Sequence, residues 1–426
     1  MQPPQNAERN PTSNRRDPVD SGRADAAALR RWLIVLSVLA VVPWLVTSII
    51  YYRSIEPPTQ PDIPPDGTVL TLKDGPWGRL TAIPVVVSPP IEYVSTSASD
   101  ADWYLPGLTP DQAVSFLAAQ GLTPVQISEL RSRIRVQPEI KGVAIAPTPS
   151  IVRSLTPDVR ARLYQQLAKV RMNRAQFDPF QYQTASPDGW FWGHTITPAT
   201  RARVEPLLYR HGESLFFADL ELLRGELDDA ELLRLAKVLN RRPTYILRLM
   251  VGPDDVEPLA DYWGVGGRRT DMRALLESMS TLRPEQRLDI IHLLPSLARD
   301  RLYRFARVTG ADYERPVIAN CLWTALNFFN QVPDDKFLDV NYALETLKRD
   351  YYIVQNNFRL GDIVGFVAEN DSLFHAAVYL ADDFVFTKNG TNPMSPWAIM
   401  RLDEVREVYR GRSEKATLIF HRHQGF

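Results

Sequence analysis

Cysteine is almost absent from this chain. Cys321 is the single cysteine among 426 residues. One thiol cannot form an intramolecular disulfide, and it cannot build a cysteine-rich zinc site. The six histidines are scattered along the chain, so we expect no metal site, and no organic cofactor is implied. Any chemistry at Cys321 must therefore come from the thiol itself and from the side chains around it.

An excess of charge of either sign is also absent. The 49 Lys and Arg residues balance the 50 Asp and Glu residues, which leaves a formal net charge of −1. Nothing in this balance indicates a nucleic-acid partner. Hydrophobic residues make up 45% of the chain, enough for well-packed cores, and the length predicts two or three domains beyond any anchor. No internal repeat period is evident.

Long uncharged runs are rare, and one near the N-terminus stands apart. Residues 32–52 carry no charge and would span roughly 30 Å as a helix, which is the thickness of one bilayer core. Arg53 is the only basic residue soon after the run, whereas several arginines precede it: Arg9, Arg15, Arg16, Arg23, Arg30 and Arg31. The positive-inside rule then predicts a retained signal anchor in the cytoplasmic (inner) membrane, with a cytoplasmic N-terminus and the bulk of the chain periplasmic or otherwise extracytoplasmic.

The rest of the chain divides by composition. We expect a disordered cytoplasmic tail over 1–31, a proline-rich linker over 53–66, a mixed and mainly α region over 67–305, and a C-terminal domain over 306–426. Within 67–305 the pattern predicts strands at 68–72, 80–87 and 245–250, and helices at 109–119, 155–170, 197–210, 228–240, 254–263, 271–282 and 284–306. The aromatic cluster at 190–194 fits core packing, a sugar-stacking groove or a partner surface.

Cys321 lies in a segment that predicts the start of a helix. Pro316 and a short apolar run precede and surround it. The positive end of a helix dipole favours thiolate, so we expect the pKa of this thiol to be depressed. The runs 360–367 and 374–380 predict adjacent strands, and His375 lies near the start of the second. A nucleophile at a helix start and a base on a strand are typical of cysteine hydrolases.

This order of features resembles the NlpC-type and CHAP-type amidase and peptidase families over roughly residues 305–426. Those families have a Gly-Asp-Leu-Val-like strand before a His-Val-Gly-Ile-Tyr-like strand, and Cys321 and His375 are separated by 54 residues (375 − 321). The resemblance implies an α+β papain-like domain with an antiparallel sheet. It also implies that Cys321 is the nucleophile, that His375 is the general base, and that amide bonds in peptidoglycan peptide stems are the substrate.

A third residue should accept a hydrogen bond from the imidazole and fix its tautomer. A two-residue turn after the second strand would place Lys388 opposite Ala377, and a turn one residue longer would place Asn389 there. Lys388 has no acceptor, and Thr387, which lies at the usual family spacing, is a weaker orienter. We therefore predict Asn389. Asp362 is interpreted as a turn residue that caps the start of its strand.

The leading hypothesis is a membrane-anchored, extracytoplasmic cysteine amidase or peptidase that acts on peptidoglycan or another amide substrate. Two alternatives stay open. The domain could be a catalytically inactive papain-like module of an envelope scaffold or binding protein, or a thiol acyltransferase. An approach of about 3–4 Å between thiol and imidazole beside an open groove indicates an enzyme. A thiol covered by Trp323 and Phe386 indicates a scaffold.

Overall fold

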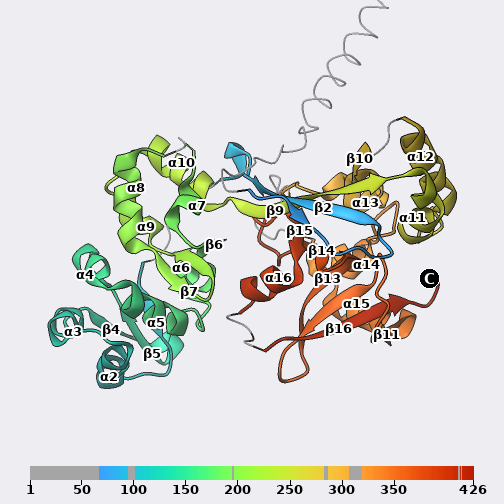
Figure 1. The fold of residues 1–426 in the computed structure, drawn as a ribbon. Coiled ribbons are helices and arrows are strands. Elements are labelled where there is room, and N and C mark those ends of the chain that lie inside the picture. Colours follow the sequence, from blue (N-terminus) through green and yellow to red (C-terminus); the bar gives the residue numbers. More distant parts are fainter. Residues whose placement is uncertain are drawn as a thin grey trace, which may run out of the picture. The chain divides into compact units, whose positions relative to one another are not determined.

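The computed structural model in Figure 1 describes residues 67–94, 101–193, 196–282, 286–306, 319–410, 413 and 415–426. All of them belong to one compact unit, Thr59–Phe426. Across these ranges, no helix combines the length and apolar character that crossing a bilayer requires. The expected membrane span at 32–52 lies outside the described residues, and so do the expected tail and linker.

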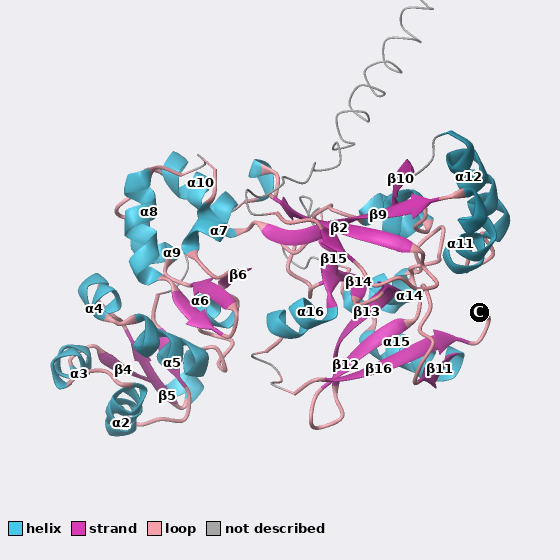
Figure 2. Cartoon of the chain, viewed as in Figure 1, coloured by secondary structure: helices cyan, strands magenta, loops and turns pink. Residues whose placement is uncertain are grey.

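The expected α+β class is confirmed, because helices accompany four antiparallel sheets in the described part of the chain (Figure 2). The largest sheet has six strands in the order β11-β16-β12-β13-β14-β15 and belongs to the C-terminal domain. Its strands are β11 (Tyr351–Val354), β12 (Ile363–Val367), β13 (Leu373–Ala381), β14 (Phe384–Lys388), β15 (Trp397–Arg401) and β16 (Thr417–His423). The expected adjacent strands around 360–367 and 374–380 are thus β12 and β13.

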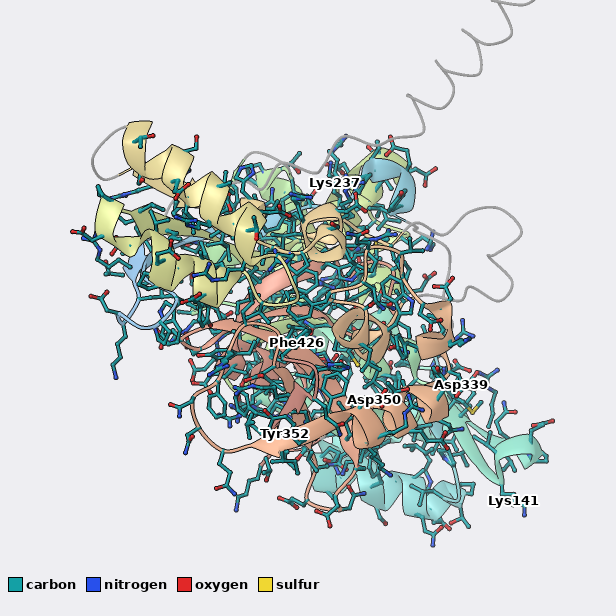
Figure 3. All side chains as sticks on the ribbon, turned by 90° about the vertical axis from the view of Figure 1, so that its right-hand side faces the viewer. Lys141, Lys237, Asp339, Asp350, Tyr352 and Phe426 are labelled. Atoms are coloured by element: carbon teal, nitrogen blue, oxygen red, sulfur yellow. The ribbon has the colours of Figure 1, made fainter. Side chains whose placement is uncertain are left out.

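Three helices accompany this sheet. They are α14 (Cys321–Leu326), α15 (Val340–Asp350) and α16 (Leu402–Val408). Figure 3 shows α15 between Asp339, whose carboxylate caps its first turn, and Asp350 at its end, with Tyr352 following on β11. The sheet separates two cores. Val378 and Phe386 belong to the core that includes α14, whereas Tyr379 and Val385 belong to the core that includes α16.

A four-stranded sheet contributes to the α14 core from an earlier part of the sequence. Its order is β1-β2-β9-β10, and it is accompanied by three helices. The elements are β1 (Leu70–Thr71), β2 (Arg79–Val87), β9 (Arg242–Val251), β10 (Gln286–Asp289), α11 (Val256–Trp263), α12 (Arg269–Leu282) and α13 (Ser296–Arg301). Thr244 on β9 bonds both backbone groups of Ile399 on β15, at 2.9 and 3.0 Å. The expected division at 305/306 therefore does not separate two hydrophobic cores.

Between β2 and β9 the chain forms two copies of one arrangement, which the sequence pattern did not reveal. Each copy runs strand, two helices, hairpin, two helices, and the sheets have matching orders, β3-β5-β4 and β6-β8-β7. The first copy is β3 (Trp103–Leu105), α2 (Pro110–Gln120), α3 (Pro124–Arg131), β4 (Ile134–Gln137), β5 (Gly142–Ile145), α4 (Pro149–Ser154) and α5 (Pro157–Leu167). After α6 (Arg174–Phe177), the second is β6 (Phe180–Gln183), α7 (Pro187–Phe191), α8 (Pro198–Val204), β7 (Tyr209–His211), β8 (Ser214–Phe217), α9 (Leu220–Leu223) and α10 (Asp229–Leu239).

The two copies share one hydrophobic core and a buried polar cluster. Arg160 on α5 is fully buried and forms an ion pair with Asp219, which precedes α9, at 3.4 Å. The Tyr164 hydroxyl donates to the same carboxylate at 2.6 Å. Burial raises the pKa of Asp219 to about 6, although the charge of Arg160 and the bond from Tyr164 oppose this rise. Of the three interpretations of the aromatic cluster at 190–194, core packing fits Trp190 and Phe191, because both are buried in this core.

Gly142 at the start of β5 offers a test of the packing in the first copy. A Cβ atom there would lie 2.3 Å from the Leu105 carbonyl oxygen, so Gly142→Ala would force two backbone segments apart. We expect a loss of about 3 kcal/mol in the free energy of unfolding. Gly225→Ala is the matched control, because its Cβ would meet nothing within 4 Å. Chemical denaturation of both variants measures the difference, and equal stabilities would contradict the packing described here.

Two of the helix predictions were wrong over part of their length. The segment 284–306 was expected to be one helix, but Gln286–Asp289 pairs with β9 as strand β10, and only Ser296–Arg301 is α-helical. Residues 197–210 were also expected to be helical throughout, but α8 ends at Val204 and the chain enters β7 at Tyr209. In both segments, pairing with a neighbouring strand prevails over local helical periodicity.

Candidate functional site

Cys321 is the first residue of α14, as the sequence predicted. The side chain of Asn320 caps the helix by accepting a hydrogen bond from the Trp323 backbone N–H at 2.9 Å. One turn later, the Thr324 hydroxyl accepts a hydrogen bond from the Trp397 indole N–H at 3.0 Å. Because Cys321 and Thr324 are three residues apart, they share a face of the helix, and that face lies against the sheet.

The sulfur of Cys321 lies among protein atoms, although the residue as a whole is only partly buried. Burial raises the pKa of the thiol above its usual value. Hydrogen bonds from the backbone of Ala376, Leu322 and Cys321 itself, together with the charge of Lys388, act in the opposite direction. The expected depression of the pKa is therefore wrong in direction, because desolvation of a thiolate outweighs the stabilisation at this helix start.

His375 lies on β13 but faces away from α14. Its Nε2 atom is 2.9 Å from the Thr387 hydroxyl. Its ring also packs against Phe366 and Tyr409, with ring centroids 5.3 and 4.5 Å away. Both aromatic residues belong to the core on the α16 side of the sheet. The imidazole is therefore buried in that core.

The structure does not bring Cys321 and His375 together. Cys321 packs against the core that contains Ala376, whereas His375 contacts the core on the other side of the sheet. Adjacent residues of a strand point to opposite faces, so Ala376 and His375 cannot both face α14. The expected approach of thiol to imidazole is thus contradicted by the geometry, even though both residues occupy the expected elements.

A one-residue irregularity in the β13–β14 hairpin determines which side chains of β14 lie on the Cys321 side of the sheet and which lie on the His375 side. Ala381 pairs with Phe384, as a two-residue turn requires. The register then shifts, so that Tyr379 pairs with Val385 and Val378 with Phe386. Continuing this register places Lys388 opposite Ala376, rather than opposite Ala377. A shift by one residue moves a side chain to the other face, and Lys388 therefore lies on the Cys321 side.

Lys388 is fully buried on that side of the sheet. Its Nζ donates hydrogen bonds to the carbonyl oxygens of Gly390 and Asn392, both at 3.1 Å. The ammonium also lies 5.5 Å from the centre of the Trp397 ring. Burial lowers the pKa of Lys388 to about 8, and the charge of Cys321 opposes this change. Fully buried lysines are rare, and a lysine with a lowered pKa is a marker of functional sites.

The remaining expectations have mixed outcomes. Thr387, not Asn389, contacts the imidazole, and the Asn389 side-chain amide instead donates to the Met400 sulfur at 3.1 Å. Asp362 does cap the start of its strand, because its carboxylate accepts a hydrogen bond from the Arg359 N–H at 2.8 Å. It also forms a buried ion pair with Arg422 at 2.7 Å. Asp362 is therefore a structural residue, and the assignment of Asn389 as the orienter was wrong.

A cavity of about 200 Å³ lies beside α16 and is not lined by Cys321 or His375. Its walls are formed by Asp403, Arg406, Glu407, Arg410, Ser413 and Ala416. Arg406 pairs with Asp403 at 2.9 Å and Arg410 with Glu407 at 2.6 Å, so the charged groups satisfy one another. The cavity is consequently not part of the arrangement around the thiol.

Comparisons with known proteins found no match to this chain. No family model matches its sequence, and neither the curated proteins nor the solved structures include a significant match. What the site does must therefore be argued from its own groups.

Proposed function

We propose that this protein is an envelope thiol hydrolase in which Cys321 attacks amide bonds, with the peptide stems of peptidoglycan as the substrate class. The proposal includes the membrane anchor at 32–52 and an extracytoplasmic position for the rest of the chain. The substrate comes from the resemblance to NlpC-type and CHAP-type enzymes, and the chemistry comes from the surroundings of the thiol.

One observation carries the proposal. The backbone amides of Ala376, Leu322 and Cys321 itself lower the pKa of the Cys321 thiol, against the larger effect of its burial. Backbone N–H groups fixed at the start of a helix stabilise a thiolate, and they also stabilise the oxyanion that forms when a thiolate attacks a carbonyl.

A second candidate has its own support. A non-catalytic papain-like module of an envelope scaffold is favoured by the separation of Cys321 from His375 and by the burial that raises the thiol pKa. This module would bind wall peptides or a protein partner without cleaving them. It differs from the hydrolase in one measurable respect, the appearance of new amino and carboxyl termini in the substrate.

Incubation of the full chain with purified cell wall, followed by mass analysis of the soluble fragments, tests the proposal. The hydrolase releases fragments cut at amide bonds, with one water added in total for each bond broken. Co-sedimentation with the wall without released fragments would favour the scaffold. If the protein neither binds the wall nor releases fragments from it, the wall is refuted as the substrate of this site.

A further inference from the structure

We propose that Lys388, and not His375, exchanges the proton of the Cys321 thiol. This inference rests on the proposed function, and it names the residue that moves the proton within the same site. His375 cannot take this role because its ring is buried on the opposite face of the sheet, against Tyr409 and Thr387.

The position of Lys388 follows from two independent contacts. The hairpin register places it opposite Ala376, whose backbone amide contacts the Cys321 sulfur. In addition, Lys388 pairs with Trp397 across β14 and β15, and the Trp397 indole bonds to Thr324 on the Cys321 face of α14. The strand register and the helix contact thus place the thiol and the amine on the same side of the sheet.

The hydrogen bonds of Lys388 leave one direction for proton exchange. An ammonium group has three N–H donors, and two of them are directed to the carbonyl oxygens of Gly390 and Asn392. The third N–H, or the lone pair that replaces it, forms no hydrogen bond within the described part of the chain, and the charge of Cys321 acts on this amine. Among the described residues, Cys321 is the charged group that acts on Lys388, and the Arg301 guanidinium of α13 lies 5.5 Å from the centre of the Trp397 ring. Lys388 titrates near pH 8, so a neutral amine is available at mildly alkaline pH.

The reaction then balances without any further group. The neutral Lys388 amine takes the thiol proton, and the thiolate forms a C–S bond to the amide carbon while the carbonyl electrons move to oxygen. When the carbonyl re-forms, the C–N bond breaks, and the departing nitrogen takes the proton from the Lys388 ammonium. Water next attacks the thioester, Lys388 accepts its proton, and the thiolate leaves and is protonated again.

The thiol itself provides the first readout, because Cys321 is the only cysteine and alkylation by iodoacetamide is visible in the intact mass. We expect the wild-type rate, measured on the full chain from pH 6 to 10, to rise with a midpoint above the free-thiol value of about 8.5, because burial raises the pKa of the Cys321 thiol. Lys388→Met should move the midpoint upward and slow alkylation at pH 8 by about tenfold for every pH unit that the midpoint rises. His375→Gln should leave the profile in place.

Lys388→Arg separates proton transfer from charge. Arginine keeps the positive charge but does not release its proton, so we expect wall cleavage to fall by roughly 10²–10⁴-fold in this variant, as in Lys388→Met. Recovery of wild-type cleavage in Lys388→Arg would overturn the proposal, because charge alone would then suffice. The wild-type profile needs no variant to fold, and a midpoint at the free-thiol value of about 8.5 would also overturn the proposal, because a buried thiol coupled to a buried amine does not titrate as a free one.

The inference and the proposed function can fail separately. If the wild type cleaves no wall but its thiol titrates with Lys388, the proton exchange stands and the hydrolase fails. If the wild type cleaves wall and Lys388→Met cleaves it equally well, the hydrolase stands and the role of Lys388 is refuted. If the pH profile of alkylation shifts in His375→Gln and not in Lys388→Met, the imidazole is the group that exchanges the thiol proton.

Discussion

Cys321→Ala is expected to abolish the release of wall fragments, by a factor of about 10³ or more, because the residue that forms the covalent bond is lost. His375→Gln should retain activity within about tenfold, since the imidazole lies in the other core and acts on the site only through packing. Released peptides quantified by mass spectrometry measure both effects on one scale.

Folding must be checked in the same samples, because His375 is buried. Glutamine keeps a hydrogen-bonding group beside the Thr387 hydroxyl, so the substitution preserves that contact as far as a side chain can. Thermal unfolding followed by circular dichroism reports any loss of structure. Inactivity of a well-folded His375→Gln, equal to that of Cys321→Ala, would contradict the arrangement described here.

Asp362→Ala is expected to lower the free energy of unfolding by about 3–5 kcal/mol, because it leaves the buried Arg422 guanidinium without its counter-charge. The carboxylate accepts from Nε and from an Nη atom of Arg422, at 2.8 and 2.7 Å, and also from the Arg359 N–H. The two bonds from Arg422 join the start of β12 to β16, and the bond from Arg359 fixes the turn before β12.

Glu369→Ala is the matched control, since Glu369 is an exposed acid in the turn between β12 and β13. Urea denaturation of both variants gives the comparison, and the control should change by less than about 0.5 kcal/mol. Equal losses in the two variants would show that the Asp362–Arg422 pair contributes nothing to stability.

The elements of the site could be predicted from the sequence, but the faces of its strands could not. The segment before Cys321 predicts a helix start, and the alternation around His375 predicts a strand, because both signals are local. The β13–β14 register depends on the shift between Tyr379 and Ala381, which moves Lys388 across the sheet. Nothing in that apolar segment distinguishes a shifted register from a regular one. Lys388 was therefore expected on the His375 side of the sheet, whereas it lies on the Cys321 side.

The duplicated arrangement shows a second limit of sequence reasoning. The N-caps Thr156 and Asp228 are 72 residues apart (228 − 156), as are the starts of β5 and β8 (214 − 142). The first strands of the two copies are 77 residues apart (180 − 103), so no single period describes both. The repeat is one of topology, preserved by strand order while the connecting lengths and side chains differ.

Threonine–proline pairs explain why many helix starts were predictable. Thr109, Thr156 and Thr197 each precede proline, and each side chain accepts a backbone hydrogen bond from the first turn of its helix. Proline at the first helical position and a threonine cap are signals that tertiary context seldom overrides. The helix ends were less predictable, because strand pairing in the folded chain decides where a periodic segment stops.

Trapping of the acyl-enzyme tests the central claim most directly. The full chain is mixed with wall peptides, quenched in acid within seconds, digested and analysed by mass spectrometry. We predict a thioester adduct on the peptide that contains Cys321, with the mass of the acyl portion of the substrate, and its absence in Cys321→Ala. Continued release of wall fragments by Cys321→Ala, with no adduct on the wild-type thiol, would contradict the account.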